Sequence, residues 1–188
     1  MEFNYIEVKQ PIGSFYLCSI PAVDLLPIVS VVSRRDSSEG IQRELSSKRI
    51  KEIGEYCSDP DAVFPTPIVV SVNEDANVKI NEKRNTITIL GNEKIGEVID
   101  GQHRLWGIEE SHNITDFDLP VVLMFDLTTE EKAYIFSTIN SNQTKVNPSL
   151  IYDLFEVSRE RSPQKTVHEI ARVMNYNEGS PFLIALKC

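Results

Sequence analysis

The chain has 188 residues, of which 41% are hydrophobic, and carries a formal net charge of −9. This length and composition predict a globular protein of one domain or slightly more, with a real hydrophobic core. The acidic balance argues against nucleic-acid binding through a broadly basic surface, because neutralising phosphates requires clustered lysine and arginine. The sequence contains no apolar run long enough for a transmembrane helix, so we expect no membrane partner.

The amino terminus and the cysteines indicate the compartment. The first residues, 1–4, lack the basic and apolar regions of a signal peptide, so we expect a cytoplasmic protein. Three scattered cysteines, Cys18, Cys57 and Cys188, form neither a disulfide framework nor a zinc motif. We therefore expect them to act as small hydrophobic residues in the interior.

The first half of the chain predicts mostly β structure. Runs of alternating or β-branched residues predict strands at 3–8, 13–18, 29–32 and 64–72. A short helical turn is expected at 22–26, and apolar residues at helical spacing predict a helix from about Ser46 to Cys57. Val78–Ile80 and Thr86–Leu90, which are separated by polar residues, predict a β-hairpin that leads towards the next strand.

The richest concentration of polar side chains follows a predicted strand at 95–99. Five consecutive residues combine a carboxylate, an amide, an imidazole and a guanidinium: Asp100, Gly101, Gln102, His103 and Arg104. Asp100 is a good helix N-cap, and Gly101 permits a sharp turn close to a ligand. The next three residues would then form the first helical turn, beside free backbone donors and the positive end of the helix dipole. This arrangement predicts an anion site, and a purely structural junction is the alternative for each residue taken alone.

A second carboxylate follows the next predicted strand, 119–125, which has the apolar composition of an internal strand. If this strand pairs near 95–99, Asp100 and Asp126 both lie at strand ends and can hold one Mg²⁺. Helix caps and turns are the alternative use of both carboxylates.

The remaining chain predicts helices. Thr128 and Glu131 form a capping box that starts a helix running to about Asn140. That helix ends in an amide-rich run in which Asn140, Gln143 and Lys145 offer donors to phosphates or bases, or else close the helix end. Further helices are expected at 147–157 and 166–174.

Two of these runs resemble the signature blocks of the DGQHR-domain proteins, the family that includes DndB and DpdB and is distantly similar to ParB and sulfiredoxin. The first block is 100–104, followed by Leu105 and Gly107, and the second is 136–146. Gln42 and Arg43, just ahead of a predicted helix, are a further point of similarity. The resemblance implies an α+β fold, with a mixed sheet forming a ParB/sulfiredoxin-like core at 1–127 and a helical extension at 128–188.

The same resemblance implies a component of a bacterial or phage DNA-modification or defence system. The implied ligand is a nucleoside triphosphate, ATP or CTP, with Mg²⁺. The implied partner is DNA, bound directly or through partner proteins. The resemblance also implies that the protein can form a homodimer. Asp100, His103 and Asn140 are the implied catalytic residues for hydrolysis. The implied nucleotide-binding residues are Gln42, Arg43, Gly101, Gln102, His103, Arg104, Gln143 and Lys145. We expect Arg104→Ala to abolish binding without unfolding the chain.

Several chemistries are excluded or left as alternatives. Sulfiredoxin chemistry requires a cysteine where this chain has Gln102, and Gln143 replaces an arginine of the corresponding ParB block, which weakens a transfer of ParB-type catalysis. The histidines show no metal-ligand spacing. Two alternatives to nucleotide binding stay open: a DndB-like DNA-binding transcriptional regulator without catalysis, and a nuclease with Asp100 and Asp126 as metal ligands.

Overall fold

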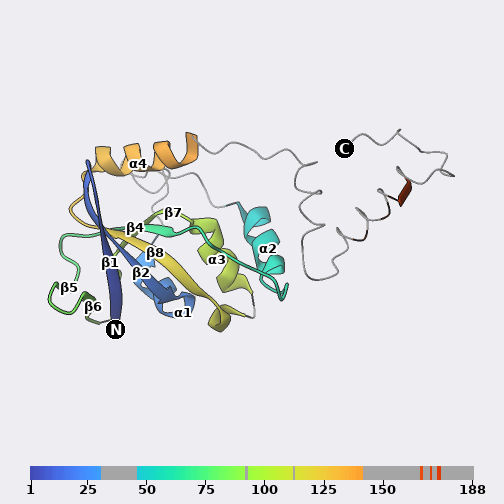
Figure 1. The fold of residues 1–188 in the computed structure, drawn as a ribbon, viewed down its shortest axis with the longest axis horizontal. Coiled ribbons are helices and arrows are strands. Elements are labelled where there is room, and N and C mark those ends of the chain that lie inside the picture. Colours follow the sequence, from blue (N-terminus) through green and yellow to red (C-terminus); the bar gives the residue numbers. More distant parts are fainter. Residues whose placement is uncertain are drawn as a thin grey trace. The chain divides into compact units, whose positions relative to one another are not determined.

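The structure, a computed structural model, describes residues 1–30, 46–91, 93–111 and 113–141, together with residues 166, 170, 173 and 174. The chain divides into two units, Met1–Asn142 and Gln143–Cys188. The first unit has the α+β fold that the sequence predicts, with helices on both faces of a sheet (Figure 1). In the second unit, the four described residues have helical backbone, where a helix was expected.

The described strands of the first unit form one mixed, eight-stranded sheet in the order β3-β7-β4-β8-β2-β1-β6-β5. Their bounds are β1 Glu2–Gln10, β2 Gly13–Pro21, β3 Val29–Ser30, β4 Ile68–Val72, β5 Val78–Asn81, β6 Thr86–Ile89, β7 Gly96–Asp100 and β8 Asp118–Met124. β4 is parallel to β8 and antiparallel to β7. β7 and β8 therefore run in opposite directions and end at opposite ends of the sheet.

The described helices include two short 3-10 turns. Their bounds are α1 Ala22–Leu25, η1 Leu26–Ile28, α2 Ser47–Tyr56, α3 Gln102–Glu110, η2 Ile114–Asp116 and α4 Thr129–Ser141. The predicted capping box of α4 is confirmed, because the Glu131 N–H donates to the Thr128 hydroxyl (3.2 Å) and the Thr128 N–H donates to the Glu131 carboxylate (2.9 Å). None of the helices in the described part of the chain combines the length and apolar character of a membrane span.

The central strands are buried on both faces, which explains their continuous apolar sequences. In β8, Val121 and Leu123 join the larger core, to which α1 and α3 also contribute. The alternate residues, Val122 and Met124, join a smaller apolar cluster beneath α4. β4 alternates between the two clusters in the same way, as the two-residue period of a strand requires.

α4 belongs to the first unit together with the sheet. Its inner face carries Ile135, Phe136 and Ile139, all of which pack into the cluster beneath it. Ala133 lies on the outer side of the helix and is exposed. Residues 128–141, which the sequence analysis grouped with a helical extension, are thus part of the sheet's packing.

The pairing expected between the strands at 95–99 and 119–125 is wrong. β4 separates β7 from β8, so the apolar strand 119–125 does not pair with the strand that precedes Asp100. The hairpin β5–β6 is confirmed, with Asn81 paired to Thr86, and it joins the far edge of the sheet beside β1. Side-chain periodicity specifies a strand but does not specify which distant strand it pairs with.

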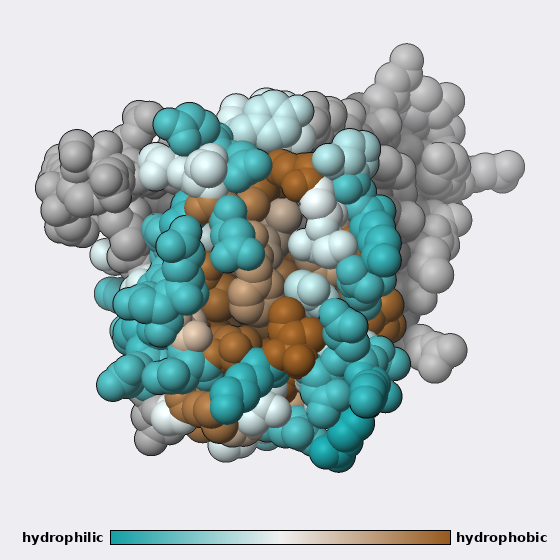
Figure 2. All heavy atoms as spheres, turned by 90° about the vertical axis from the view of Figure 1, so that its left-hand side faces the viewer, coloured by the Kyte–Doolittle hydropathy of each residue, from teal (hydrophilic) through white to brown (hydrophobic). Residues whose placement is uncertain are grey.

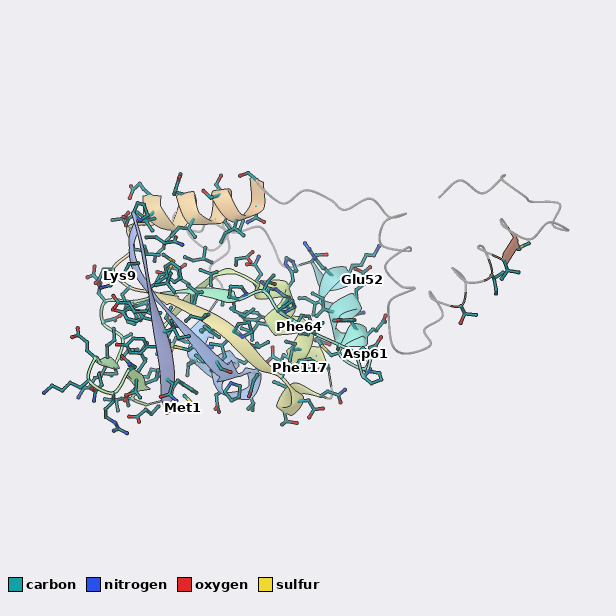
Figure 3. All side chains as sticks on the ribbon, in the orientation of Figure 1. Met1, Lys9, Glu52, Asp61, Phe64 and Phe117 are labelled. Carbon is teal, nitrogen blue, oxygen red and sulfur yellow. The ribbon has the colours of Figure 1, made fainter. Side chains whose placement is uncertain are left out.

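The residues before β4 form no strand, although a strand was expected from Phe64. β4 begins at Ile68, directly after two prolines, which have no N–H to donate to a neighbouring strand. Aromatic contacts hold this segment instead. The Phe64 ring packs against Tyr56 (centroids 5.5 Å apart) and against Phe117 (5.4 Å), and the labelled side chains of Phe64 and Phe117 lie close together in Figure 3.

Candidate functional site

α3 begins at a glycine with left-handed backbone. Gly101 has a φ of 95° and is the N-cap of α3, and no side chain caps this helix. Asp100, the predicted cap, is the last residue of β7, and its carboxylate accepts instead from Arg104 Nη2 over 3.2 Å. A Cβ atom at Gly101 would lie 2.5 Å from Ile68 Cδ1, so the tight approach of the turn to β4 also requires glycine.

Arg104 holds the residues that surround the start of α3. Its Nη1 donates to the backbone oxygen of Thr66 and to Thr66 Oγ1 (2.6 Å), and its Nη2 donates to the Pro67 carbonyl oxygen (2.9 Å) as well as to Asp100. Burial lowers the pKa of the Arg104 guanidinium and the Asp100 carboxylate opposes this shift, so the group stays charged. Removal of Arg104 would leave these acceptors unpaired, so Arg104→Ala should destabilise the start of α3 in addition to any effect on binding.

His103 joins α3 to α2. The backbone N–H of Ser46 donates to His103 Nε2 over 3.1 Å, and the Ser46 hydroxyl caps α2 by accepting from the Arg49 N–H (3.4 Å). Burial lowers the pKa of His103, the positive charge of Arg49 lowers it further, and Asp100 raises it. The imidazole is therefore neutral at pH 7, with an acceptor at Nε2 and its proton on Nδ1.

α2 and α3 pack side by side in the same direction. Ser46 at the start of α2 contacts His103 near the start of α3, and Gly54 in the second half of α2 lies against Gly107. A Cβ atom at Gly107 would lie 2.4 Å from Ile53 Cγ2, so this glycine allows the close approach of the two helices. Because the helices are parallel, both N-termini face the same place. We call it the helix corner, made of residues 46–49 and 100–104.

Gln102 is the only residue of the predicted binding run that lies in the interior. It is 6% exposed, whereas Gly101, His103 and Arg104 are half-buried. Asp100 and the four residues after it lie at the start of α3, where the side chains of His103 and Arg104 bond to neighbouring segments. The first helical bond of α3 joins the Leu105 N–H to the Gly101 carbonyl (3.1 Å), so the N–H groups before Leu105 point out of the helix end.

Asp126 lies far from the helix corner. It follows β8, whose Met124 pairs with Ser71 near the end of β4, whereas Asp100 pairs with Val69 at the beginning of that strand. Since β7 and β8 are antiparallel, the two carboxylates are separated by about 13 Å along the strands alone. The predicted shared metal site is wrong, and with it the nuclease hypothesis loses its ligand pair. Among the described residues, no group of three or more potential metal ligands is present.

Asn140, the other predicted catalytic residue, is exposed in the last turn of α4, where its side-chain amide donates to the Phe136 carbonyl oxygen (2.8 Å). Lys132 bonds to Glu97 (2.6 Å) near the start of α4, and Ile139 belongs to the same cluster as Ile99. The end of α4 thus lies on the Asp100 side of β7, and no contact joins Asn140 to the helix corner in the described part of the chain. Four predicted residues lie outside the described residues: Gln42, Arg43, Gln143 and Lys145.

The contribution of α2 to the site was not predicted from the sequence. Ser46 was expected only as a helix end, yet its backbone N–H donates to His103. Arg49 was given no role, yet its charge lowers the pKa of the same imidazole. A serine just before a helical pattern is an N-cap signal, but it does not indicate which other helix lies next to it.

Comparisons with known proteins place the chain in a family. No relative was found among curated protein sequences. The structure of the C-terminally truncated chromosome-partitioning protein ParB from Caulobacter crescentus, complexed with CTP-gamma-S, is similar with a TM-score of 0.49 and 14% identity, covering 85% of this chain and 75% of the ParB chain. The family model of DndB, described as DNA-sulfur modification-associated, matches residues 3–175. The chain therefore belongs to the DndB family of DNA-sulfur modification-associated proteins, which confirms the resemblance seen in its sequence.

Proposed function

We propose that the helix corner binds the phosphates of a nucleoside triphosphate as part of the DNA-modification role of this family. The observation that carries the proposal is the parallel packing of α2 and α3, fixed by the bond between the Ser46 N–H and His103 Nε2. Each helix N-terminus is equivalent to about half a positive charge, so two adjacent N-termini attract an anion more strongly than one. Helix N-termini with free N–H groups are common phosphate sites.

The donors of the proposed site come from both helices. The backbone N–H groups of Gln102, His103 and Arg104 precede the first helical bond of α3. His103 Nδ1 adds a neutral donor, and Arg49 adds an exposed positive charge. Arg104 positions the start of α3 through its bonds to the 66–67 backbone. From the sequence, the residues outside the described part, such as Arg43 and Lys145, remain expected contributors.

The Mg²⁺ of the proposed complex would arrive with the nucleotide. Mg²⁺ is commonly held by phosphate oxygens and one or two protein carboxylates, with water in the other positions. Asp100 is the carboxylate at the helix corner, and the bond from Arg104 to its Oδ2 fixes its orientation. Hydrolysis of the nucleotide by Asp100, His103 and Asn140 is a separate expectation, to be tested by phosphate release.

The experiment is calorimetric titration with ATP, CTP and GTP in the presence of Mg²⁺, using the wild-type chain and two variants. Arg49→Gln removes an exposed charge of the helix corner, and Lys79→Gln makes the same change on β5, at the edge of the sheet. We expect one nucleotide to bind, and Arg49→Gln to weaken it about fivefold to tenfold, as for a charged hydrogen bond. Failure of all three nucleotides to bind, or equal effects of both variants, would contradict the proposal.

A DNA-binding regulator is the second candidate, because Lys48, Arg49 and Lys51 lie exposed within one turn at the start of α2. Those cations and the helix N-termini are also suited to the phosphates of a DNA backbone. Duplex DNA titrated at several salt concentrations separates the two candidates. Salt-dependent duplex binding that needs no nucleotide and is weakened by Arg49→Gln would favour the regulator.

A further inference from the structure

A hollow lies on the side of the molecule where β5 and the β1–β2 turn meet the start of α4. Figure 2 shows it as an apolar floor inside a hydrophilic rim. Its volume is about 450 Å³, within the range of ligand-binding sites. Its apolar lining includes Ile12, Tyr16, Ile80, Met124, Phe125 and Leu127.

The floor of the hollow is built on a fixed stack of rings. Tyr16 packs edge-to-face against Phe125 (centroids 5.5 Å apart) and against Tyr5 (4.9 Å). Two aliphatic residues of the lining are exposed beside this stack, Ile12 and Ile80, each 37% exposed. The exposed isoleucines and the ordered rings together form a preformed apolar surface, on which an apolar side chain of a partner can pack.

The rim of the hollow is acidic. Asp126 and Glu131 line it, and Glu7 accepts from the hydroxyl of Ser14, another lining residue (2.7 Å). Glu7 and Glu82 both act electrostatically on the Tyr16 phenol, whose pKa is raised first by burial and then by Glu7, Tyr5 and Glu82. Two nearby lysines are each paired with a carboxylate: Lys9 lies 3.7 Å from Glu7, and Lys132, beside Asp126, lies 2.6 Å from Glu97. Carboxylates therefore dominate the charge around an apolar floor.

We propose that this hollow docks a basic segment of a protein partner, with an apolar side chain on the ring stack and a lysine or arginine against Asp126 and Glu131. The charge complementarity selects this occupant, because the acidic rim attracts lysine and arginine and repels phosphate, and therefore nucleic acid. The hollow includes Asp126, at the opposite end of the sheet from Asp100. It is thus independent of the helix corner and of the nucleotide proposed there.

The test uses fluorescent peptides and anisotropy. One peptide alternates leucine and isoleucine with lysine and arginine, a second replaces its basic residues by glutamate, and a third replaces its apolar residues by glycine. Asp126→Asn removes a rim charge, and asparagine tolerates the left-handed φ of 56° found there. Ile80→Thr removes part of the apolar wall and keeps a β-branched residue on β5. Glu109→Gln on α3 and Val63→Thr are matched changes at exposed sites outside the hollow.

We expect the full-chain protein to bind the basic–apolar peptide and neither of the other two. Asp126→Asn should weaken binding about threefold to fivefold at low salt, as for a partly exposed ion pair. Ile80→Thr should weaken it about fivefold, in line with loss of part of an apolar contact. The proposal is overturned if the basic–apolar peptide does not bind, if the acidic peptide binds as well, or if the matched variants reduce binding as much as Asp126→Asn and Ile80→Thr do.

Discussion

The backbone N–H of Ser46 donates to Nε2 of His103 over 3.1 Å, between residues 57 positions apart in the sequence. An imidazole nitrogen accepts this bond only while it is unprotonated. Burial and the charge of Arg49 lower the pKa of His103, with Asp100 acting in the opposite direction. The attachment of the start of α2 to α3 is therefore linked to the protonation state of one side chain.

Acidification should destabilise the first unit through His103. The folded-state pKa is below the unfolded value of about 6.5, so between the two values the unfolded chain binds more protons. The contribution of neutral His103 to the free energy of unfolding is therefore complete above about pH 6.5, and it decreases as the pH is lowered below that value. Thermal melts between about pH 8 and pH 5 measure this loss.

His103→Gln is the control for this pH dependence, because the glutamine oxygen accepts from the Ser46 N–H and does not titrate. The variant should melt near the wild-type temperature at pH 8 and show a flatter dependence below about pH 6.5. An unchanged pH profile in His103→Gln would assign the acid sensitivity to other groups.

Arg104→Ala should destabilise the first unit by about 2 to 3 kcal/mol, because it leaves partly buried acceptors at residues 66–67 and Asp100 without their donor. Arg104→Lys should recover little of this loss, since an ammonium does not reproduce the planar fork. Urea unfolding measures both. Arg49→Ala, an exposed change one helix away, should cost less than about 0.5 kcal/mol, and a similar cost for Arg104→Ala would contradict the structural role.

Gly107→Ala should destabilise the contact between α2 and α3 by about 1 to 3 kcal/mol through overpacking, because the new methyl group meets Ile53. Gly54→Ala is the matched change across the contact. Its Cβ would lie 3.3 Å from the Gly107 oxygen, and the gain in helix propensity of about 1 kcal/mol should offset that crowding. Chemical denaturation compares the free energies of unfolding of the two variants. The double variant Ile53→Ala/Gly107→Ala should lose less free energy of unfolding than the sum of the two single changes, because the removed side chain makes room for the new methyl group.

Asp126→Asn should leave Mg²⁺-dependent nucleotide affinity unchanged, whereas Asp100→Asn should weaken it about tenfold by removing a carboxylate from the helix corner. The physical reason is that β7 and β8 end at opposite ends of the sheet. Titration of both variants at several Mg²⁺ concentrations measures the difference. Equal losses would require the two carboxylates to share a metal, contrary to the strand directions.

Local features of the fold were predictable from the sequence. The α4 capping box, the β5–β6 hairpin and the glycine turn before α3 all depend on residues within a few positions of each other. The motif 100–104 also folds as one local unit, as expected. Such features are encoded in neighbouring residues, and the structure confirms them.

Features set by distant contacts were not predictable. Asp100 was assigned as a cap because aspartate favours that position, but Arg104 one turn later binds its carboxylate. The shared metal site failed because it assumed that β8 lies next to β7, whereas β4 lies between them. Arg49 escaped notice because its effect on His103 depends on the contact between two helices, which the spacing of apolar residues does not specify.

The position of β2 between β1 and β8, with Phe15 paired to Met124, determines when the sheet can close during synthesis. β1 and β2 emerge from the ribosome early, as a hairpin, but the edge of β2 that receives β8 stays unpaired until most of the first unit has been made. At typical elongation rates that interval is roughly 5 to 20 s. An open strand edge pairs readily with other chains. The nascent chain is therefore most exposed to aggregation before β8 emerges, and truncations that end ahead of β8 should be insoluble.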